Sequence, residues 1–290
     1  MQIIVNTVVL ASLYSLIGCG FVLIYRASHV VNLAQGELMA MGGYFLFTVA
    51  MGLFHTPFPS FLGASMFSLA LGFMVYFFLM RFMAGESLFA AILATIALGI
   101  LLRGLITLIW TSQLWHPLEK MGIKNTSHGL IQDAVISTFG IVTILSALLL
   151  YVGLFFCLKF TRWGLRMRAM GENPLLASRR GIRLHNYYAF SWGLAALTGG
   201  FAGMIQSCDA ILEPGMTVIG LKAFPVVLVG GLDSLGGVIP GAFIVALAET
   251  VAINYISPQA SEAAPFVVLL TMLLIRPWGL FGSKEELERV

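Results

Sequence analysis

The chain has 290 residues, of which 59% are hydrophobic and only 10% are charged, and its mean hydropathy is +0.95. A soluble domain carries about 25% charged residues, so this composition excludes a soluble protein, whereas a bilayer accepts apolar side chains on the outer surface. The net charge of +3, without a basic helix interleaved with aromatic residues, argues against a nucleic-acid partner.

Apolar runs repeat along the whole chain. A helix needs ~20 residues to cross the hydrocarbon core, and the runs at 217–232 and 260–276 fall short of this. These two are predicted to be tilted, re-entrant or half-spanning. The chain is therefore predicted to be a single all-α polytopic membrane domain over 1–290, with about eight transmembrane helices and one or two short or re-entrant segments. The remaining runs lie at 3–25, 30–53, 60–80, 88–109, 135–158, 187–207 and 238–256.

The cations predict the orientation, because loops on the cytoplasmic side concentrate Lys and Arg. The segment 159–186 is richest in them and is predicted to be cytoplasmic. The C-terminal tail is expected on the same side, and counting back through the runs puts the N-terminus outside. The first run lacks a basic region before it, so it is expected to remain as a span. The cations of this segment are Lys159, Arg162, Arg166, Arg168, Arg179, Arg180 and Arg183.

Within that segment the sequence predicts a short capped helix. Asn173 suits the N-cap, Pro174 suits the first helical position, and Gly181 follows the last turn. The alternative is a loop that lies on anionic lipid, but such a loop needs no defined helix, so docking to another protein is favoured. The predicted docking residues are Glu172, Asn173, Pro174, Leu175, Leu176, Arg179, Arg180 and Gly181.

Polar residues inside the apolar runs are candidates for a path or a gate. An ionised group at the centre of a span costs about 2.5–3.5 kcal/mol, so Glu37 and Glu249 are expected to face the bundle or water. Asn32 and Gln35 have capping-box spacing, which would put Glu37 in the first turn of a helix. The cap is the local explanation, and a substrate or gating role at a broken helix is the functional one.

Small residues indicate close helix contacts. Glu249 shares a face with Ala242 and Ala246, which predicts a closely apposed helix, either as a structural hydrogen-bond partner or along a path. A second permease is expected to supply that helix. The rows Ala195, Gly199, Gly203 and Gly237, Gly241 predict packing between helices.

The polar interruptions 32–37 and 230–237 suggest an internal repeat, since transporters often pair broken segments in their two halves.

Several blocks resemble the LivH-type permeases of branched-chain amino-acid ABC importers. The block 168–174 with Ala177 and 181–182 resembles the coupling segment of that family, and it leads into the Gly/Ala-rich block 195–203. Further similar blocks are 32–37 with 42–44, 230–241 and the ending 276–282, and Gln35 stands where the family more often has histidine. The resemblance covers about 10–282, while 110–134 carries no matching block.

The resemblance implies a permease that works with a second homologous permease, two cytoplasmic ABC ATPase subunits and a periplasmic binding protein, in the bacterial inner membrane and in contact with its lipid. No phosphate-binding Gly-x-x-x-x-Gly-Lys-Ser/Thr motif occurs, so ATP chemistry is expected from a partner. No cofactor, metal or enzymatic activity is expected. The alternatives are an ABC permease for urea or short amides, and an ATP-independent carrier or channel for a small neutral solute.

Two enzyme classes fit poorly. A serine protease suggested by Gly63-Ala64-Ser65 would need a base histidine in a later span, and no histidine follows His185. A haem-binding redox subunit would need paired histidines within spans, which the runs lack.

Overall fold

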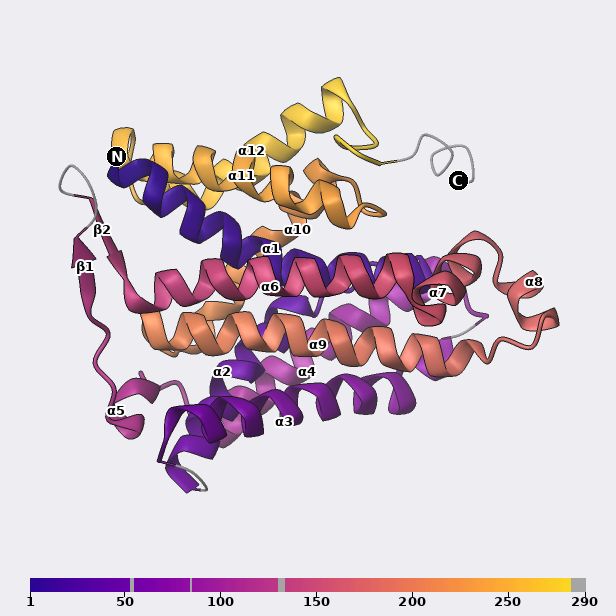
Figure 1. Ribbon diagram of the computed structural model, residues 1–290, viewed down its shortest axis with the longest axis horizontal. Coiled ribbons are helices and arrows are strands. Elements are labelled where there is room, and N and C mark those ends of the chain that lie inside the picture. The colour runs from indigo at the N-terminus through magenta and orange to yellow at the C-terminus, as the bar shows by residue number, and fades with distance from the viewer. Residues whose placement is uncertain (53–54, 84, 130–133, 283–290) are drawn as a thin grey trace.

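The computed structural model describes residues 1–52, 55–83, 85–129 and 134–282. Helices make up most of this part of the chain (Figure 1). The longer helices are α1 (Gln2–Ser28), α2 (Gln35–Gly52), α3 (Pro57–Phe78), α4 (Leu88–Trp110), α6 (Thr138–Phe160), α9 (Leu184–Asp209), α10 (Thr217–Gly230), α11 (Leu235–Tyr255) and α12 (Ala260–Ile275). The shorter elements are η1 (Met80–Met83), α5 (Pro117–Met121), β1 (Ser127–Gly129), β2 (Val135–Ser137), α7 (Arg162–Glu172), α8 (Pro174–Arg179) and η3 (Pro214–Met216).

The helices confirm an all-α polytopic membrane protein. Helices α1, α3, α4, α6 and α11 are each long and apolar enough to cross a membrane, and the shorter segments 214–230 and 260–275 are apolar as well. Helix α9 has 26 residues but is more polar, with Ser191, Thr198 and Ser207 all buried. A helix at the centre of a bundle can carry such residues because other helices separate it from lipid.

The bundle has two ends with different structures (Figure 1). At one end, called the hairpin end, β1 and β2 pair antiparallel, and Gln2 at the start of α1 bonds to the backbone of Val135. At the other, called the α7–α8 end, the His29 ring lies 3.0 Å from the carbonyl oxygen of Gly171. Helix α1 therefore runs the full length of the bundle, from the hairpin end to the α7–α8 end.

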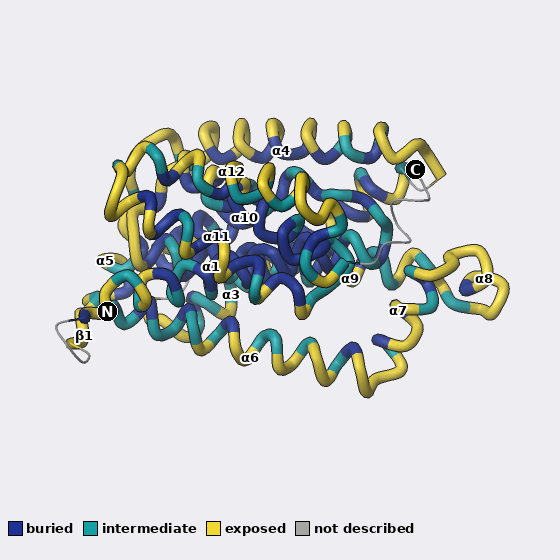
Figure 2. The backbone as a smooth tube through the Cα atoms, turned by 90° about the horizontal axis from the view of Figure 1, so that it is seen from above, coloured by how far each residue is buried: buried dark blue, intermediate teal, exposed yellow. Residues whose placement is uncertain are grey.

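Burial separates a central group of helices from a peripheral one (Figure 2). In its most apolar window α1 is 78% buried, whereas α6 is only 17% buried. Helices α1 and α9 pack closely together, α2 packs on α9, and α11 packs on α1. Helices α4 and α6 expose long faces at the edge, as expected for surfaces in lipid or against a partner.

Glycines allow the central backbones to approach closely. A Cβ on Gly203 would overlap the carbonyl of Met39, and one on Gly241 would lie 2.5 Å from the carbonyl oxygen of Val226. Both rows of small residues predicted to pack helices therefore do so.

Helix α2 begins inside the bundle rather than at its end, so the interruption predicted at 32–37 is present and shortens the apolar run predicted over 30–53. Residues 29–34 turn back from the end of α1 without forming a helix. Gln35 then lies against Gly20, about 12 Å from the end of α1 at 1.5 Å per residue. Helix α2, with 18 residues against the 27 of α1, therefore covers only the part of the bundle from its interior to the hairpin end.

Helix α10 repeats this arrangement in the opposite direction. Residues 210–216 return from the hairpin end, where Leu212 and Trp115 exchange backbone hydrogen bonds, and α10 starts inside the bundle at Thr217. It then runs toward the α7–α8 end. Its short length agrees with the short or half-spanning segment predicted at 217–232.

The two halves of the chain form an inverted repeat. In each half a full-length helix (α1 or α9) leads through a connecting segment into a shorter helix that begins inside the bundle (α2 or α10), here called a half-length helix. Two further helices (α3–α4 or α11–α12) follow. The packing of α1 on α11 matches that of α9 on α3. The predicted pairing of 32–37 with 230–237 is thus wrong, because 230–237 spans the turn at 231–234 and the adjoining ends of α10 and α11. The counterpart of 29–34 is instead 210–216.

Candidate functional site

The half-length helices cross where each begins. A Cβ on Gly220 of α10 would overlap the Cα of Gly36, and a Cβ on Gly36 would lie 2.5 Å from the carbonyl oxygen of Thr217. The first turns of α2 and α10 are thus in backbone contact in the interior. Broken helices of this kind form the substrate sites of many transporters.

Asn32 and Gln35 are fully buried and hold the start of α2 in place. The Asn32 amide donates to Gln35 Oε1 at 3.0 Å, and Gln35 Nε2 donates to the Ala195 carbonyl at 3.0 Å. The predicted capping box does not form, because Asn32 Oδ1 accepts from the N–H of Ala34, two residues on, and the helix starts only at Gln35. Gln35 therefore ties the break to α9, and Asn32 holds the Gln35 amide in place.

Glu37 lies in the first turn of α2, as predicted, and pairs with a cation on α4. Arg103 Nη2 lies 3.3 Å from Glu37 Oε1 and donates to Thr217 Oγ1 at 2.5 Å. These contacts join α2, α4 and the first residue of α10. Arg103 was not singled out from sequence. Its position within an apolar run was the signal that could have identified it.

A groove of about 420 Å³ exposes this ion pair on the surface of the bundle. The Arg103 side chain is 54% exposed, while that of Glu37 is 13% exposed. Arg103 lies seven residues from the hairpin end of α4, about 10 Å along the helix, so this charge is exposed at membrane depth. The groove is lined by Leu33, Glu37, Ile96, Gly99, Ile100, Arg103, Gly104 and Thr107.

Glu249 forms a second, buried cluster. Its carboxylate accepts from Lys222 Nζ and from the Tyr14 hydroxyl, each at 2.5 Å. The three groups come from α11, α10 and α1, and all are nearly inaccessible. The prediction that Glu249 faces the bundle is confirmed, but the helices on its Ala242 and Ala246 face belong to this chain. Helices α1 and α10 already satisfy the carboxylate, so Glu249 needs no second permease.

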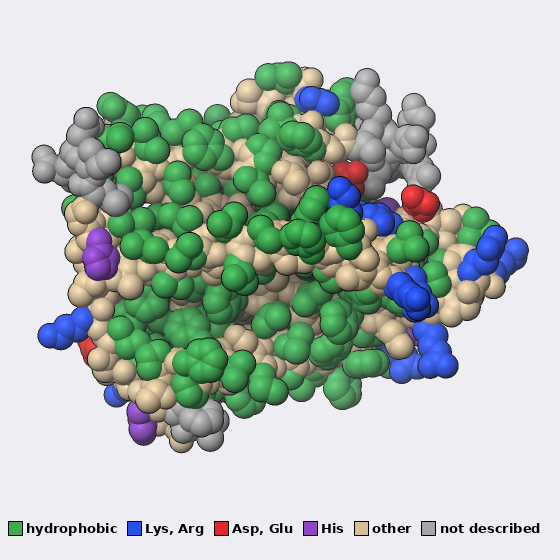
Figure 3. Space-filling view, viewed as in Figure 1, with side chains coloured by type: hydrophobic (Ala, Val, Ile, Leu, Met, Phe, Trp, Pro, Cys, Tyr) green, Lys and Arg blue, Asp and Glu red, His purple; other side chains and the backbone are tan. Residues whose placement is uncertain are grey.

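Helix α8 projects from the α7–α8 end (Figures 1 and 2). Asn173 Oδ1 accepts from the N–H of Leu176 at 3.0 Å, Pro174 is the first helical residue, and Gly181 has φ +80°. The predicted cap, first residue and terminating glycine are all present. Leu175 and Leu176 are 64% and 56% exposed on this short helix. The Lys and Arg side chains gather at the same end (Figure 3).

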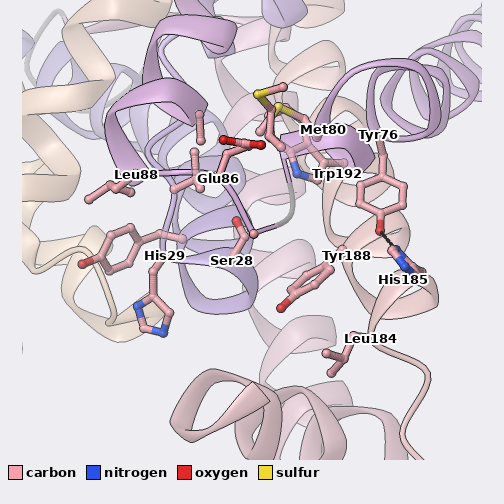
Figure 4. A pocket seen from close by; sticks show the side chains of 15 residues that line it. Ser28, His29, Tyr76, Met80, Glu86, Leu88, Leu184, His185, Tyr188 and Trp192 are labelled. Atoms are coloured by element: carbon pink, nitrogen blue, oxygen red, sulfur yellow. Dashed lines mark hydrogen bonds between the residues drawn. The ribbon is translucent and has the colours of Figure 1, made fainter. Parts of the chain in front are cut away.

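A cavity of about 680 Å³ opens between the ends of α1 and α3 and the start of α9 (Figure 4). Tyr76, Tyr188 and Trp192 provide aromatic walls. The Tyr76 hydroxyl points to His185, with 2.7 Å between Oη and Nδ1. Apolar walls with a few polar tips are typical of small-molecule pockets, and none of these residues was singled out from sequence.

The predicted functional residues fall into three separate places. Asn32, Gln35 and Glu37 come together at the helix crossing, Glu249 lies in its own buried cluster, and the residues of 172–181 form the projecting helix. Among the described residues, no three His, Cys, Asp or Glu side chains gather as metal ligands would.

Comparison with known proteins extends over the whole chain. The family model for the permease component of branched-chain amino acid transport systems matches residues 3–275. The high-affinity branched-chain amino acid transport system permease protein LivH of Escherichia coli is 26% identical, with 100% of this chain and 97% of that protein covered. The corresponding protein BraD of Pseudomonas aeruginosa is 25% identical, with coverage of 100% and 98%. A probable branched-chain amino acid transport permease of Methanocaldococcus jannaschii is 26% identical over 97% of this chain and 92% of its own length.

Proposed function

The chain belongs to the family of branched-chain amino acid transport permeases, and from this premise we propose that it is the membrane subunit of an ABC importer. It would move branched-chain or related amino acids across the bacterial inner membrane, driven by two separate ATPase subunits and supplied by a periplasmic binding protein. The observation that carries this proposal is the agreement between the full-length family match and the projecting helix α8.

The orientation that fits this function places the α7–α8 end in the cytoplasm and the N-terminus outside. The cations support it, because Lys and Arg gather at that end (Figure 3). In the periplasm the hairpin end would then meet the binding protein. Lys120 and Lys124, which are exposed near that end, remain a minor counter-signal.

The coupling element would be 172–181. A capped helix whose Leu175 and Leu176 side chains are exposed suits insertion into a cleft of another protein, because water-exposed leucines gain free energy when a partner covers them. Arg179 and Arg180 follow at the C-terminal end of the helix, where cations are favoured and could pair with acidic groups of the ATPase.

The transport path would pass the groove of Glu37 and Arg103. A zwitterionic amino acid carries one charge of each sign, so its carboxylate could bind Arg103 and its ammonium group Glu37. The apolar groove residues, such as Ile96 and Ile100, could then receive a branched side chain. Asn32 and Gln35 would hold the broken helix in position, and Glu249 would act in the interior rather than in the path.

A second permease would cover this groove. An exposed arginine at membrane depth is unfavourable against lipid, and the neighbouring surface of α4 is strongly apolar, with Ile100 71% and Leu108 79% exposed. A paired subunit, or a water-filled path between two subunits, would account for both the exposed arginine and the apolar surface. The exposed surface of α4, rather than Glu249, therefore supports a second permease.

Co-expression with candidate ATPases, purification and reconstitution test the proposal. Ala177→Pro removes the hydrogen bond from the Ala177 N–H to the Asn173 carbonyl, 3.0 Å long, and should break α8. We expect the ATPase to co-purify with the wild-type chain and to be lost from the variant, while both chains insert in the membrane. Ser178→Ala, a change at an exposed position of the same helix, is the control.

The same experiment separates the ABC permease from an ATP-independent carrier. The buried Lys222–Glu249 pair favours the carrier more than the sequence suggested, because coupled carriers often hold ionisable groups in the membrane. Solute uptake by the purified chain alone, without an ATPase, would establish the carrier and overturn the proposal.

A further inference from the structure

A second groove, of about 860 Å³, runs along the outside of the bundle between α6 and α11. Its wall is largely apolar, and its charged residues come from α1, α6, α7 and the turn before α11. The charged residues are Arg26, Lys159, Arg168 and Asp233. The apolar and aromatic residues are Leu148, Tyr151, Val152, Leu154, Phe155, Phe156, Leu158, Leu235, Ile239 and Phe281.

The length of this groove matches one leaflet of a bilayer. On α6 its lining extends from Leu148 to Lys159, about 17 Å at 1.5 Å per residue. Half of a hydrocarbon core of ~30 Å is about 15 Å. The apolar wall therefore reaches from the middle of the membrane to the level of the headgroups at the α7–α8 end.

The cations lie where a headgroup would be. Arg26 is half-buried, while Lys159 and Arg168 are exposed. The Lys159 ammonium lies 5.1 Å from the Phe155 ring centre, so it sits above the apolar wall. Three cations and the single carboxylate of Asp233 leave a net charge of +2 in the groove. Guanidinium and ammonium groups are well suited to bind phosphate.

We propose that this groove binds one anionic glycerophospholipid. Its phosphate contacts Arg26, Lys159 and Arg168, and an acyl chain lies along Val152, Phe156 and Ile239. Basic pockets between transmembrane helices recognise acidic lipids through this combination of charge and apolar wall. The site is distinct from the Glu37 groove and from α8, and it depends on neither the substrate nor the ATPase.

Lipid retention by the full-length chain tests the proposal. The chain is reconstituted with phosphatidylethanolamine and phosphatidylglycerol, re-extracted in mild detergent, and its bound lipid is quantified by mass spectrometry. We expect the wild type to retain phosphatidylglycerol selectively. A basic residue near the headgroups contributes about fivefold in binding, so Lys159→Gln with Arg168→Gln should weaken retention by about thirty-fold.

Two further variants make the result decisive. Lys120→Gln with Lys124→Gln removes the same charge from the hairpin end and should leave retention unchanged. Val152→Trp fills the exposed apolar wall without changing charge and should reduce retention of phosphatidylglycerol. If both double variants lose phosphatidylglycerol equally, retention depends only on the net charge of the protein, and the proposed site is wrong. Wild-type retention of phosphatidylethanolamine as strong as that of phosphatidylglycerol, or of neither lipid, would also overturn it.

Discussion

The two ion pairs at membrane depth differ in exposure, and this difference separates their roles. The Lys222 and Glu249 side chains are 10% and 6% exposed, whereas Arg103 is 54% exposed. A buried pair with a third partner, Tyr14, has no access to solute and holds helices together. A pair that opens on a groove can exchange its internal contact for contacts with a ligand.

The buried cluster should behave as a structural unit. Glu249→Leu leaves the Lys222 charge without a partner in the interior, and breaking a buried pair in this way costs ~3–5 kcal/mol. Removing all three polar groups, with Tyr14→Phe, Lys222→Met and Glu249→Leu together, should recover most of that loss, because no unpaired group remains. Both variants are compared with the wild type by their free energy of unfolding in mixed micelles. A triple variant as unstable as Glu249→Leu would show that the carboxylate acts independently of Lys222.

The exposed pair should affect transport more than stability. In the reconstituted complex, with the binding protein unchanged, Glu37→Gln and Arg103→Gln should each lower uptake of a branched-chain amino acid at least about tenfold, equivalent to ~1.4 kcal/mol. Thr107→Val alters the same groove without removing a charge and serves as the control. Wild-type uptake in both charge variants would exclude the groove from the path.

Among the elements, the crossing of α2 and α10 tolerates no side chain. Gly220→Ala places a methyl group on the backbone of Gly36, so the two half-length helices must separate. We expect a loss of folded yield and a lower thermal midpoint. Gly153→Ala on α6 is matched in chemistry but has open space around it, and there the change should be neutral or stabilising by up to ~1 kcal/mol. Equal stability of the two variants would mean that the crossing is not tight.

Features set by neighbouring residues could be predicted from sequence, and those set by distant contacts could not. The α8 cap depends on Asn173, Pro174 and Gly181 alone, and the structure has it as predicted. The polar residues of 32–37 indicated a break in the apolar run 30–53. Its start at 29 was not indicated, because Val30 and Val31 are as apolar as a helix would be. Its depth inside the bundle was not indicated either, because the distant contact of Gln35 with Ala195 of α9 sets it.

The partners of Glu249 lie 235 and 27 residues away in sequence. No local pattern indicates such contacts. Glu249 does have hydrogen-bond partners on neighbouring helices, as expected. These helices are α1 and α10 of the same chain, however, and not a helix of a second permease. Arg103 and Lys222 were passed over because each stands alone in an apolar run, although a lone cation there needs a partner.

For the whole molecule, the inverted repeat puts the two half-length helices in opposite directions about one crossing. Helix α2 faces the hairpin end and α10 faces the α7–α8 end, so each half reaches one side of the membrane. Movement of one half against the other would open the crossing to each side in turn, as in other transporters built from inverted repeats. Which end faces the cytoplasm then decides which helix, α2 or α10, leads to the cytoplasmic side.

Cysteine labelling tests the proposed orientation. Ser178→Cys on α8 and Lys124→Cys near the hairpin are both at exposed positions. Of the native cysteines, Cys19 and Cys208 are buried, so a Cys157→Ser background suffices. A membrane-impermeant maleimide should label Lys124→Cys in intact cells and Ser178→Cys only after the cells are opened. The reverse pattern would invert the topology.

The same label also reports on docking. If α8 inserts into an ATPase subunit, co-expression of that subunit should slow labelling of Ser178→Cys in opened cells, and Ala177→Pro should restore it. Labelling at Lys124→Cys is the internal control, because it lies at the opposite end of the bundle. If Ser178→Cys is labelled only in opened cells but the ATPase subunit does not slow its labelling, α8 is free in the cytoplasm. That result would support the proposed topology and contradict the coupling role of α8.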